Sequence, residues 1–175
     1  MAILTILTYP DERLAQKSLP VTTFGPELKK ICEDMLETMY EAPGIGLAAP
    51  QVNIHQNIVV MDIDYESSED EPPVLSNKVP RIFINPKITR REGKTLFKEG
   101  CLSVPGTYEE VERAEKVTLE YQDLEAKTHI LETDGLLAVA VQHELDHLDG
   151  RLFIDRLSFM KRKTLKKKLL KELEE

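Results

Sequence analysis

The stretch that decides the fold reads LLAVAVQHELDHLDG and spans residues 136–150. It contains the pattern H-E-x-x-H, which places His143 and His147 four residues apart. On a helix, residues with this spacing lie on the same face, one turn from each other. Two imidazoles in that relation can bind one metal ion, and the intervening Glu144 can serve as a general base. The stretch therefore predicts a helix that carries a metal site.

The first part of this stretch, residues 136–141, is apolar on every side. A helix of that kind is buried, and about 17 residues is too long for a strand. Thr133 or Asp134 can cap its start, and Gly150 can end it. Two histidines on an ordinary helix are the alternative interpretation. However, an Asp-rich, His-rich last turn is costly to bury unless its polar groups are satisfied, which a metal would do.

Composition narrows the class of protein. The 175 residues suit one domain with one core. The net charge of -8 and the pI near 5.1 argue against general nucleic-acid binding, and we expect no specific DNA binding. No apolar run approaches the roughly 18 residues of a membrane span, and the first residues lack the features of a signal peptide. Two cysteines, Cys32 and Cys101, form no disulfide framework. We expect a cytoplasmic protein.

Helical spacing of apolar residues predicts a helix that starts at Pro26, with Cys32 packed in the core. We predict strands at residues 58–63, 81–85, 116–121 and 128–131, with Pro86 ending the second and a hairpin joining the last two. The acidic, Pro/Ser-rich residues 64–80 predict a mobile surface loop. Residues 158–175 predict a final helix, with its leucines packed inward: Leu165, Leu169 and Leu170.

A catalytic zinc-type site needs a third protein ligand and an open position for water. A further histidine downstream of Gly150 would complete a known protease pattern, but that position holds Phe153. We therefore expect an upstream ligand. Cys101 is the best candidate, because it lies in a tight non-helical segment and a thiolate binds iron(II) or zinc strongly. His129 is the second candidate, although a surface position is more typical of such an isolated histidine.

Three stretches of the chain resemble the signature motifs of peptide deformylases, in the order and spacing of that family. They are GIGLAAPQ at 44–51, EGCLS at 99–103 and QHELDHLDG at 142–150. The resemblance covers essentially the whole chain, including the C-terminal helix of the bacterial type 1 enzymes. It implies an α+β fold in which antiparallel β-sheets surround a central buried H-E-x-x-H helix, with an N-terminal and a C-terminal helix. Residues 1–175 would form one catalytic domain, with 158–175 as its terminal helix.

The resemblance also implies an activity, namely removal of the N-formyl group from the initiator methionine of nascent polypeptides, with release of formate. It makes His143, His147 and Cys101 ligands of one metal, with iron(II) as the physiological ion and zinc or nickel as substitutes. Glu144 would handle protons. The oxyanion of the reaction would be stabilised by the Gln51 side-chain amide and the Leu102 backbone N–H.

Substrate contacts follow in part from helix geometry. Leu136, Val139 and Ala140 precede His143 by seven, four and three residues, so all three share its face. They predict an apolar slot beside the metal that suits a methionine side chain. We expect Ile45 and Gly46 on the opposite wall, with Gly46 backbone groups contacting the peptide.

The resemblance suggests that Arg113 pairs with Glu99 to brace the cysteine loop. The chain departs from many relatives at Tyr108, where they carry an arginine. Contacts to the peptide beyond its first residue are therefore not predicted.

Two rival functions remain at this stage, a metallopeptidase that cleaves internal peptide bonds and a non-catalytic structural metal site. The missing third histidine counts against the first, and the lack of a fourth ligand counts against the second. We expect a monomer. Seven basic residues between Lys161 and Lys171 either form a solvated helix face or dock on an anionic partner such as the ribosome.

Overall fold

The structure is a computed structural model that describes residues 2–174. Its helices are η1 (Glu12–Ala15), α1 (Pro26–Glu41), η2 (Ala49–Val52), α2 (Gly135–Leu148), η3 (Phe153–Arg156) and α3 (Phe159–Leu173), where η marks a 3-10 helix. Its strands are β1 (Gly46–Ala48), β2 (Ile58–Met61), β3 (Glu66–Ser67), β4 (Leu75–Ser76), β5 (Arg81–Glu92), β6 (Thr95–Cys101), β7 (Val104–Arg113), β8 (Lys116–Gln122) and β9 (Thr128–Asp134).

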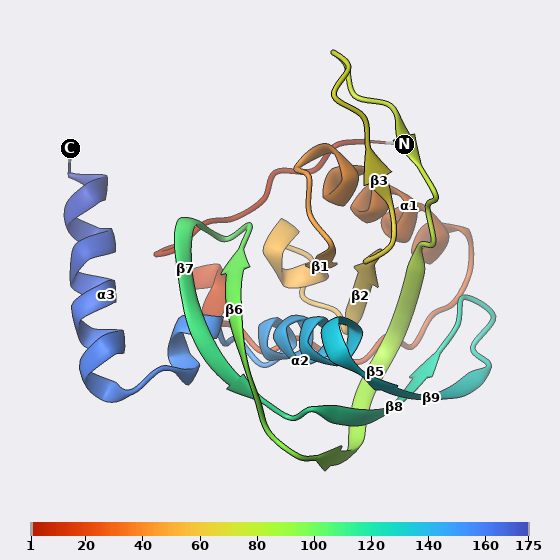
Figure 1. Cartoon of the computed structure of the whole chain (residues 1–175). Coiled ribbons are helices and arrows are strands. Elements are labelled where there is room, and N and C mark those ends of the chain that lie inside the picture. Colours follow the sequence, from red (N-terminus) through yellow and green to blue (C-terminus); the bar gives the residue numbers. More distant parts are fainter. Residues whose placement is uncertain (1, 175) are drawn as a thin grey trace.

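The strands form antiparallel sheets. One sheet has five strands in the order β1-β2-β5-β8-β9, and β3–β4 and β6–β7 form separate two-stranded sheets (Figure 1). Helices and antiparallel sheets in one chain confirm the predicted α+β class. The predicted hairpin of β8 and β9 is also confirmed.

Helix α1 begins as expected at Pro26, where a missing N–H costs no helical hydrogen bond. Its apolar side faces the core, where Cys32, Met35 and Met39 have no exposed surface. They pack with residues of β1 and β2, including Leu47 and Ile58. The prediction that Cys32 is a core residue is therefore confirmed.

Helix α2 buries eleven of its 14 residues. It contacts β1, β2, β8, β9 and η2, so its environment comes from segments spread along the chain. Gly135 has a φ of 61°, which lets the chain turn sharply from β9 into the helix. The helix is shorter than expected. Thr133 belongs to β9, Asp134 makes no side-chain cap, and the last helical residue is Leu148.

Strand β5 corrects a prediction, because it continues through Pro86 to Glu92. Its ladder with β2 ends at Ile84, so beyond that residue β5 has one neighbour, β8. The ladder with β8 shifts register between Ile84 and Lys87. A proline lacks an N–H donor and is tolerated at a strand edge or a bulge, which is the position that Pro86 occupies.

Two further predictions were inaccurate. The strand predicted at residues 58–63 is β2, which ends at Met61. Residues 64–80, predicted as a mobile loop, contain the small β3–β4 hairpin. The β6–β7 hairpin was not predicted as strands, because its sequence alternates weakly between apolar and polar residues. Its tip, which carries Cys101, is the part that shapes the site.

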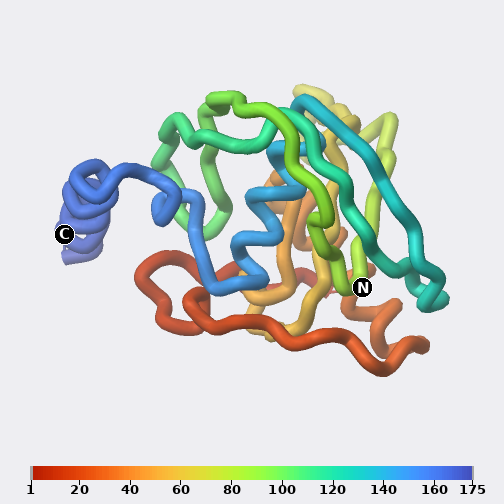
Figure 2. The backbone as a smooth tube through the Cα atoms, turned by 90° about the horizontal axis from the view of Figure 1, so that it is seen from below, coloured from red at the N-terminus to blue at the C-terminus, as the bar shows by residue number. Residues whose placement is uncertain are grey.

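Helix α3 stands at one side of the molecule (Figures 1 and 2). Ser158 caps its start by accepting a hydrogen bond from the Lys161 N–H, and none of its residues is buried. Leu165 and Leu169 pack partly against the cluster around Phe153. Leu170 is 45% exposed, so the prediction that it packs inward is wrong. Within the described residues, every helix is too short or too polar to cross a membrane.

Candidate metal centre and active site

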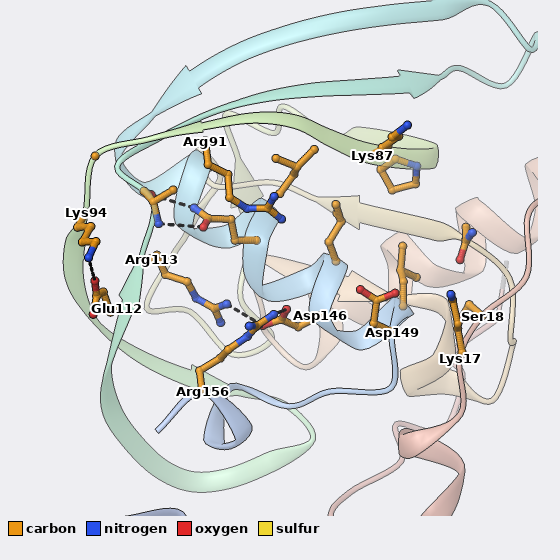
Figure 3. Close-up of a pocket in the computed structure, with 18 residues that line it drawn as sticks. Lys17, Ser18, Lys87, Arg91, Lys94, Glu112, Arg113, Asp146, Asp149 and Arg156 are labelled. Atoms are coloured by element: carbon orange, nitrogen blue, oxygen red, sulfur yellow. Dashed lines mark hydrogen bonds and ion pairs between the residues drawn. The ribbon is translucent and has the colours of Figure 1, made fainter. Parts of the chain in front are cut away.

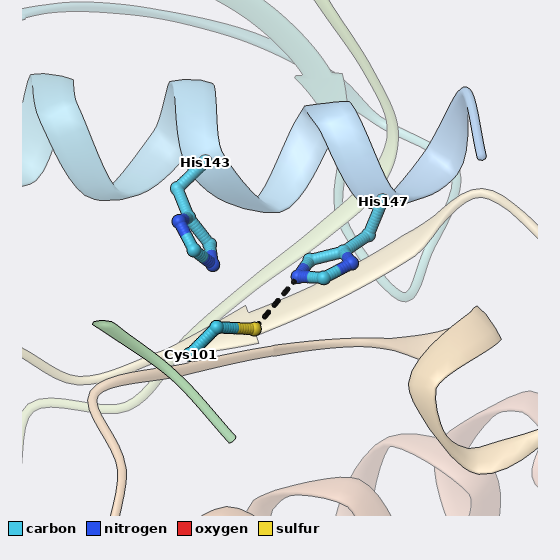
Figure 4. A group of neighbouring side chains, drawn as sticks. All are labelled: Cys101, His143 and His147. Atoms are coloured by element: carbon cyan, nitrogen blue, oxygen red, sulfur yellow. Dashed lines mark hydrogen bonds between the residues drawn. The ribbon is translucent and has the colours of Figure 1, made fainter. Parts of the chain in front are cut away.

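A cysteine and two histidines converge where the tip of β6 meets α2 (Figure 4). The donor atoms of Cys101, His143 and His147 all lie within 4.8 Å of one another. Cys101 Sγ is 3.3 Å from His147 Nε2. The other candidate ligand, His129, lies exposed on the β8–β9 hairpin, where its Nε2 is 2.7 Å from Asp123 Oδ2. The fold thus brings Cys101, and not His129, to the two helix histidines.

The orientation of His143 is fixed by a buried carboxylate. Its Nδ1 lies 2.8 Å from Glu99 Oε1, and a carboxylate can only accept, so Nδ1 carries a proton and Nε2 is the ring nitrogen left to face a metal. Arg113 donates to both Glu99 oxygens, at 2.7 and 2.8 Å. This is the pair that the resemblance suggested. It holds one histidine in an orientation that leaves its Nε2 available to a metal.

Asp146 is satisfied by arginines. It accepts from Arg113 Nη1 at 2.6 Å and from Arg156 Nε at 3.1 Å. The sequence argument expected a metal to satisfy the acidic last turn of the helix. The structure corrects this for Asp146, and Asp149 is exposed. The sequence analysis did not predict that Asp146 pairs with these arginines (Figure 3). The feature that could have indicated it is a charged residue on a helix turn whose other residues are mostly buried.

The histidines beside Cys101 favour the thiolate form of its side chain. Burial alone would raise the pKa of the Cys101 thiol, but His147 and His143 outweigh it and hold that pKa well below its ordinary value. The thiolate is the form that binds metals. Burial raises the pKa of Glu144, against the opposing influence of His143 and His147. Glu144 Oε2 has no hydrogen-bond partner within residues 2–174, so one oxygen of a buried carboxyl remains free to act.

Gln51 lies in η2 with 1% of its surface exposed. Its Oε1 accepts from the Ala48 N–H at 2.9 Å, which directs the amide nitrogen the other way. That Nε2 donates to Ser103 Oγ at 3.0 Å and lies 3.7 Å from Cys101 Sγ. Ser103 was not assigned a role from the sequence. It holds the Gln51 amide beside the cysteine, and its own N–H is 3.4 Å from Cys101 Sγ.

A cavity of about 500 Å³ opens beside these groups, within the size range of small-molecule sites. Nearly all the residues predicted to act or to bind substrate line it: Ile45, Gly46, Gln51, Cys101, Leu102, Leu136, Val139, Ala140, His143 and Glu144. Gly46 leaves room for the Glu144 side chain, because a Cβ atom at this position would come within 3.1 Å of it.

Two aromatic residues also line the cavity, Phe97 and Tyr108. Phe97 was given no role from the sequence, whereas Tyr108 was identified there only as a departure that bears on contacts to the peptide. Tyr108 packs over Gly100, where a Cβ atom would lie 2.5 Å from the tyrosine ring. The glycine beside the cysteine thus makes room for the Tyr108 ring. No pattern along one strand pointed to this contact, because it forms across the β6–β7 hairpin.

Comparison with known proteins agrees with this geometry. A family model described as polypeptide deformylase matches residues 3–163. The chain belongs to the polypeptide deformylase family. A peptide deformylase of Chromobacterium violaceum is 52% identical over 171 residues, covering 98% of this chain and 96% of that protein. One from Neisseria meningitidis is 50% identical, with the same coverage.

Solved structures of peptide deformylases share the fold. The crystal structure of a peptide deformylase from Legionella pneumophila has a TM-score of 0.86 and 43% identity, covering 99% of this chain and 96% of that one. Membership of the deformylase family confirms the predicted hydrolase function, removal of the N-formyl group from nascent peptides. It decides against a metallopeptidase and against a purely structural metal site.

Proposed function

We propose that the chain performs deformylation with Cys101, His143 and His147 as the ligands of one divalent metal ion. One thiolate and two imidazoles suit iron(II) or zinc, and we infer iron(II) as the physiological ion, with zinc or nickel as substitutes. The clustering of the three donor atoms within 4.8 Å is the observation that carries this proposal. When bound there, a divalent ion polarises a carbonyl and lowers the pKa of water.

Glu144 is the proton carrier in this proposal. It is not part of the donor cluster, it lines the cavity, and one of its oxygens has no partner in the described chain. It takes a proton from the attacking water and passes it to the leaving amine, which is the work of a general base and then a general acid. A pKa raised by burial brings the group closer to the pH at which it works.

Gln51 and Leu102 stabilise the oxyanion that forms when water adds to the formyl carbon. The Gln51 amide nitrogen is already directed to the cysteine side of the cavity, and Leu102 lines that same side. Donors held in place before the reaction need no reorganisation as charge develops. Removing one such donor typically lowers the rate roughly 100- to 1,000-fold.

The methionine side chain enters the apolar part of the cavity. Leu136, Val139 and Ala140 line it from α2, and Ile45 and Gly46 from the segment that leads into β1. A long, unbranched thioether fits an apolar slot of this kind, whereas a charged side chain would lose hydration without gaining a partner. The backbone of Gly46 contacts the peptide.

We propose the same wider setting as for other bacterial deformylases. Residues 1–175 act as one catalytic domain, as a monomer in the cytoplasm, on formylmethionyl chains that emerge from the ribosome. The basic residues of α3 dock on the ribosome. Support for this docking comes from charge, because α3 carries seven basic residues in a chain of net charge -8.

A pair of cysteine variants tests the ligand set. We expect Cys101→Ser to lose most of its bound metal, since a hydroxyl is a much poorer ligand than a thiolate. Cys32→Ser is the matched control. Burial raises the pKa of Cys32 to about 12, so this residue remains a thiol in the core. Metal analysis of anaerobically purified proteins measures both. Full metal content in the Cys101 variant would remove it from the ligand set.

The substrate is tested with two peptides that differ in one group. Formate release from formyl-Met-Ala-Ser should be rapid, whereas acetyl-Met-Ala-Ser should remain almost intact because its extra methyl group crowds the carbonyl. Comparable hydrolysis of both peptides would contradict a site built for the formyl group.

A further inference from the structure

The segment that leads into β1 forms one wall of the substrate cavity, with Gly44, Ile45 and Gly46 in its lining. Between the end of α1 at Glu41 and the start of β1 at Gly46, no helix or strand holds the backbone. Gly44 also lies against the cysteine loop, where a Cβ atom would come 2.8 Å from Leu102 Cδ1. A small movement of this segment would therefore change the shape of the cavity.

Hydrogen bonds from three other parts of the chain fix the backbone of this segment. The Gly44 N–H donates to the Met39 carbonyl of α1 at 2.8 Å. The Asp62 N–H donates to the Ile45 carbonyl at 2.9 Å. The third bond comes from a side chain, because the Tyr65 hydroxyl donates to the Gly44 carbonyl at 2.9 Å. Tyr65 is not part of the cavity lining, so it can influence a substrate only through this wall.

The bond from Tyr65 sets the orientation of the peptide group between Gly44 and Ile45. A peptide group is planar and trans, so its carbonyl and its N–H point in opposite directions. With the carbonyl turned to Tyr65, the Ile45 N–H is directed away from that ring. Within residues 2–174 this N–H has no backbone acceptor. A backbone donor thus remains available on a residue that lines the cavity.

Tyr65 is held in place by a buried carboxylate, that of Asp62, which has no exposed surface. This carboxylate accepts from the N–H groups of Asp64 and Tyr65 at 2.9 and 3.1 Å. It also accepts from the Val79 N–H at 2.8 Å. Asp62 precedes β3 and Val79 follows β4, so the carboxylate closes the base of the β3–β4 hairpin, which extends past α1 in Figure 1.

The ring of Tyr65 is oriented by a second tyrosine. It packs edge-to-face on Tyr40 of α1, with ring centroids 4.9 Å apart and ring planes at 90°. The Tyr40 hydroxyl donates to Asp62 Oδ2 at 2.6 Å, and not to the wall. Burial, together with the charge of Asp62, raises the pKa of Tyr65, so its hydroxyl keeps the proton that it donates. Two tyrosines therefore share one environment, and the hydroxyl of one of them binds the substrate wall.

We propose that Tyr65 is a positioning residue for deformylation, which holds the peptide group between Gly44 and Ile45 in the orientation that binds the substrate backbone. This role rests on the proposed function of Ile45 and Gly46 as one wall of the site. A group that is oriented before binding costs less to order when the substrate arrives. The amide groups that such a wall binds do not change charge in the reaction. The contact therefore lowers KM and leaves kcat unaltered.

The test compares Tyr65→Phe with Tyr40→Phe in the zinc-loaded, full-length protein. Each variant loses one hydroxyl from the same aromatic pair, and Asp62 keeps its three backbone donors in both. We expect Tyr65→Phe to raise KM for formyl-Met-Ala-Ser about three- to tenfold, the usual effect of one hydrogen bond, with little change in kcat. Tyr40→Phe should leave both constants nearly unchanged. A general loss of structure would not separate KM from kcat in this way.

A second measurement follows the wall directly by NMR. The Ile45 amide nitrogen is bonded to the Gly44 carbonyl carbon, so its resonance responds to the hydrogen bond at that carbonyl. Tyr65→Phe should shift this resonance, whereas Tyr40→Phe should move it much less. In the wild-type protein, the product peptide Met-Ala-Ser should shift the amides of Ile45 and Gly46 when added at a concentration that inhibits formate release.

Two results would overturn the proposal, and they differ in meaning. If the inhibiting peptide leaves the Ile45 and Gly46 amides unshifted, the wall is wrongly assigned and Tyr65 has nothing to position. If these amides respond but the two variants have equal KM values, or Tyr65→Phe lowers kcat alone, the wall is correctly assigned and Tyr65 does not prepare it for the peptide.

Discussion

Helices α2 and α3 have nearly the same length, 14 and 15 residues, and opposite surroundings. Eleven residues of α2 are buried, whereas α3 buries none. Both carry polar groups that matter to the proposed function, namely metal ligands on one and basic residues on the other. Ligands must hold a fixed geometry, and packing on several sides provides it. A charged docking surface needs only to remain accessible.

The difference originates in sequence pattern. The first half of α2 is apolar all round, so it can be covered by strands on more than one side. In α3, leucines alternate with runs of lysine, and only Leu165 and Leu169 pack against the body. A lysine-rich face keeps its charges in water, since burying an unpaired charge is very costly. The following changes test whether the two helices differ as this comparison requires.

The largest contrast should appear when one glutamate on each helix loses its charge. Glu144→Gln on α2 should lower formate release about 100- to 10,000-fold, the usual contribution of a general acid–base group. Its metal content should remain normal, because Glu144 lies outside the donor cluster. Glu172→Gln on α3 makes the same chemical change and should leave turnover unaltered. A metal-loaded Glu144 variant with near wild-type turnover would exclude this residue from the mechanism.

A second contrast concerns stability, with one leucine truncated on each helix. Leu137 is 7% exposed and packs with residues of the large sheet, whereas Leu170 is 45% exposed. Leu137→Ala should lower the free energy of unfolding by about 2–5 kcal/mol, through lost burial and the cavity left behind. Leu170→Ala should change it by no more than about 0.5 kcal/mol. Urea unfolding of the metal-loaded proteins measures both, and similar losses would show that α3 is packed as firmly as α2.

Removing most of α3 should have little effect on catalysis. Deletion of residues 161–175 should leave formate release from a short peptide within a few-fold of the full chain, since no lining residue of the substrate cavity lies there. The same deletion should reduce co-sedimentation with ribosomes at low salt, because contacts between lysines and phosphates release counter-ions and weaken as salt rises. Equal co-sedimentation of both proteins would mean that the basic face is merely solvated.

The sequence by itself determined the features that depend on local spacing. The four-residue spacing of His143 and His147 places both on one helix face in any fold that keeps the helix, and the apolar run before them requires burial. Pro26 as a helix start, and the alternating pattern of apolar and polar residues in β8 and β9, are local signals in the same sense. The structure contains the predicted helix and the predicted hairpin. Three motifs in one order were specific enough to indicate the family.

Tertiary structure decided what depends on residues far apart in the chain. The spacing alone left Cys101 and His129 as rival candidates, and only the position of the β6 tip against α2 showed that Cys101, and not His129, lies beside the two helix histidines. Asp146 could not be assigned from the sequence, because its partners Arg113 and Arg156 come from β7 and η3. Pro86 could continue a strand because β2 had already ended beside it. Helix and strand periodicity report which face of an element is apolar, whereas the partner of each face is set by packing between elements, which no local pattern contains.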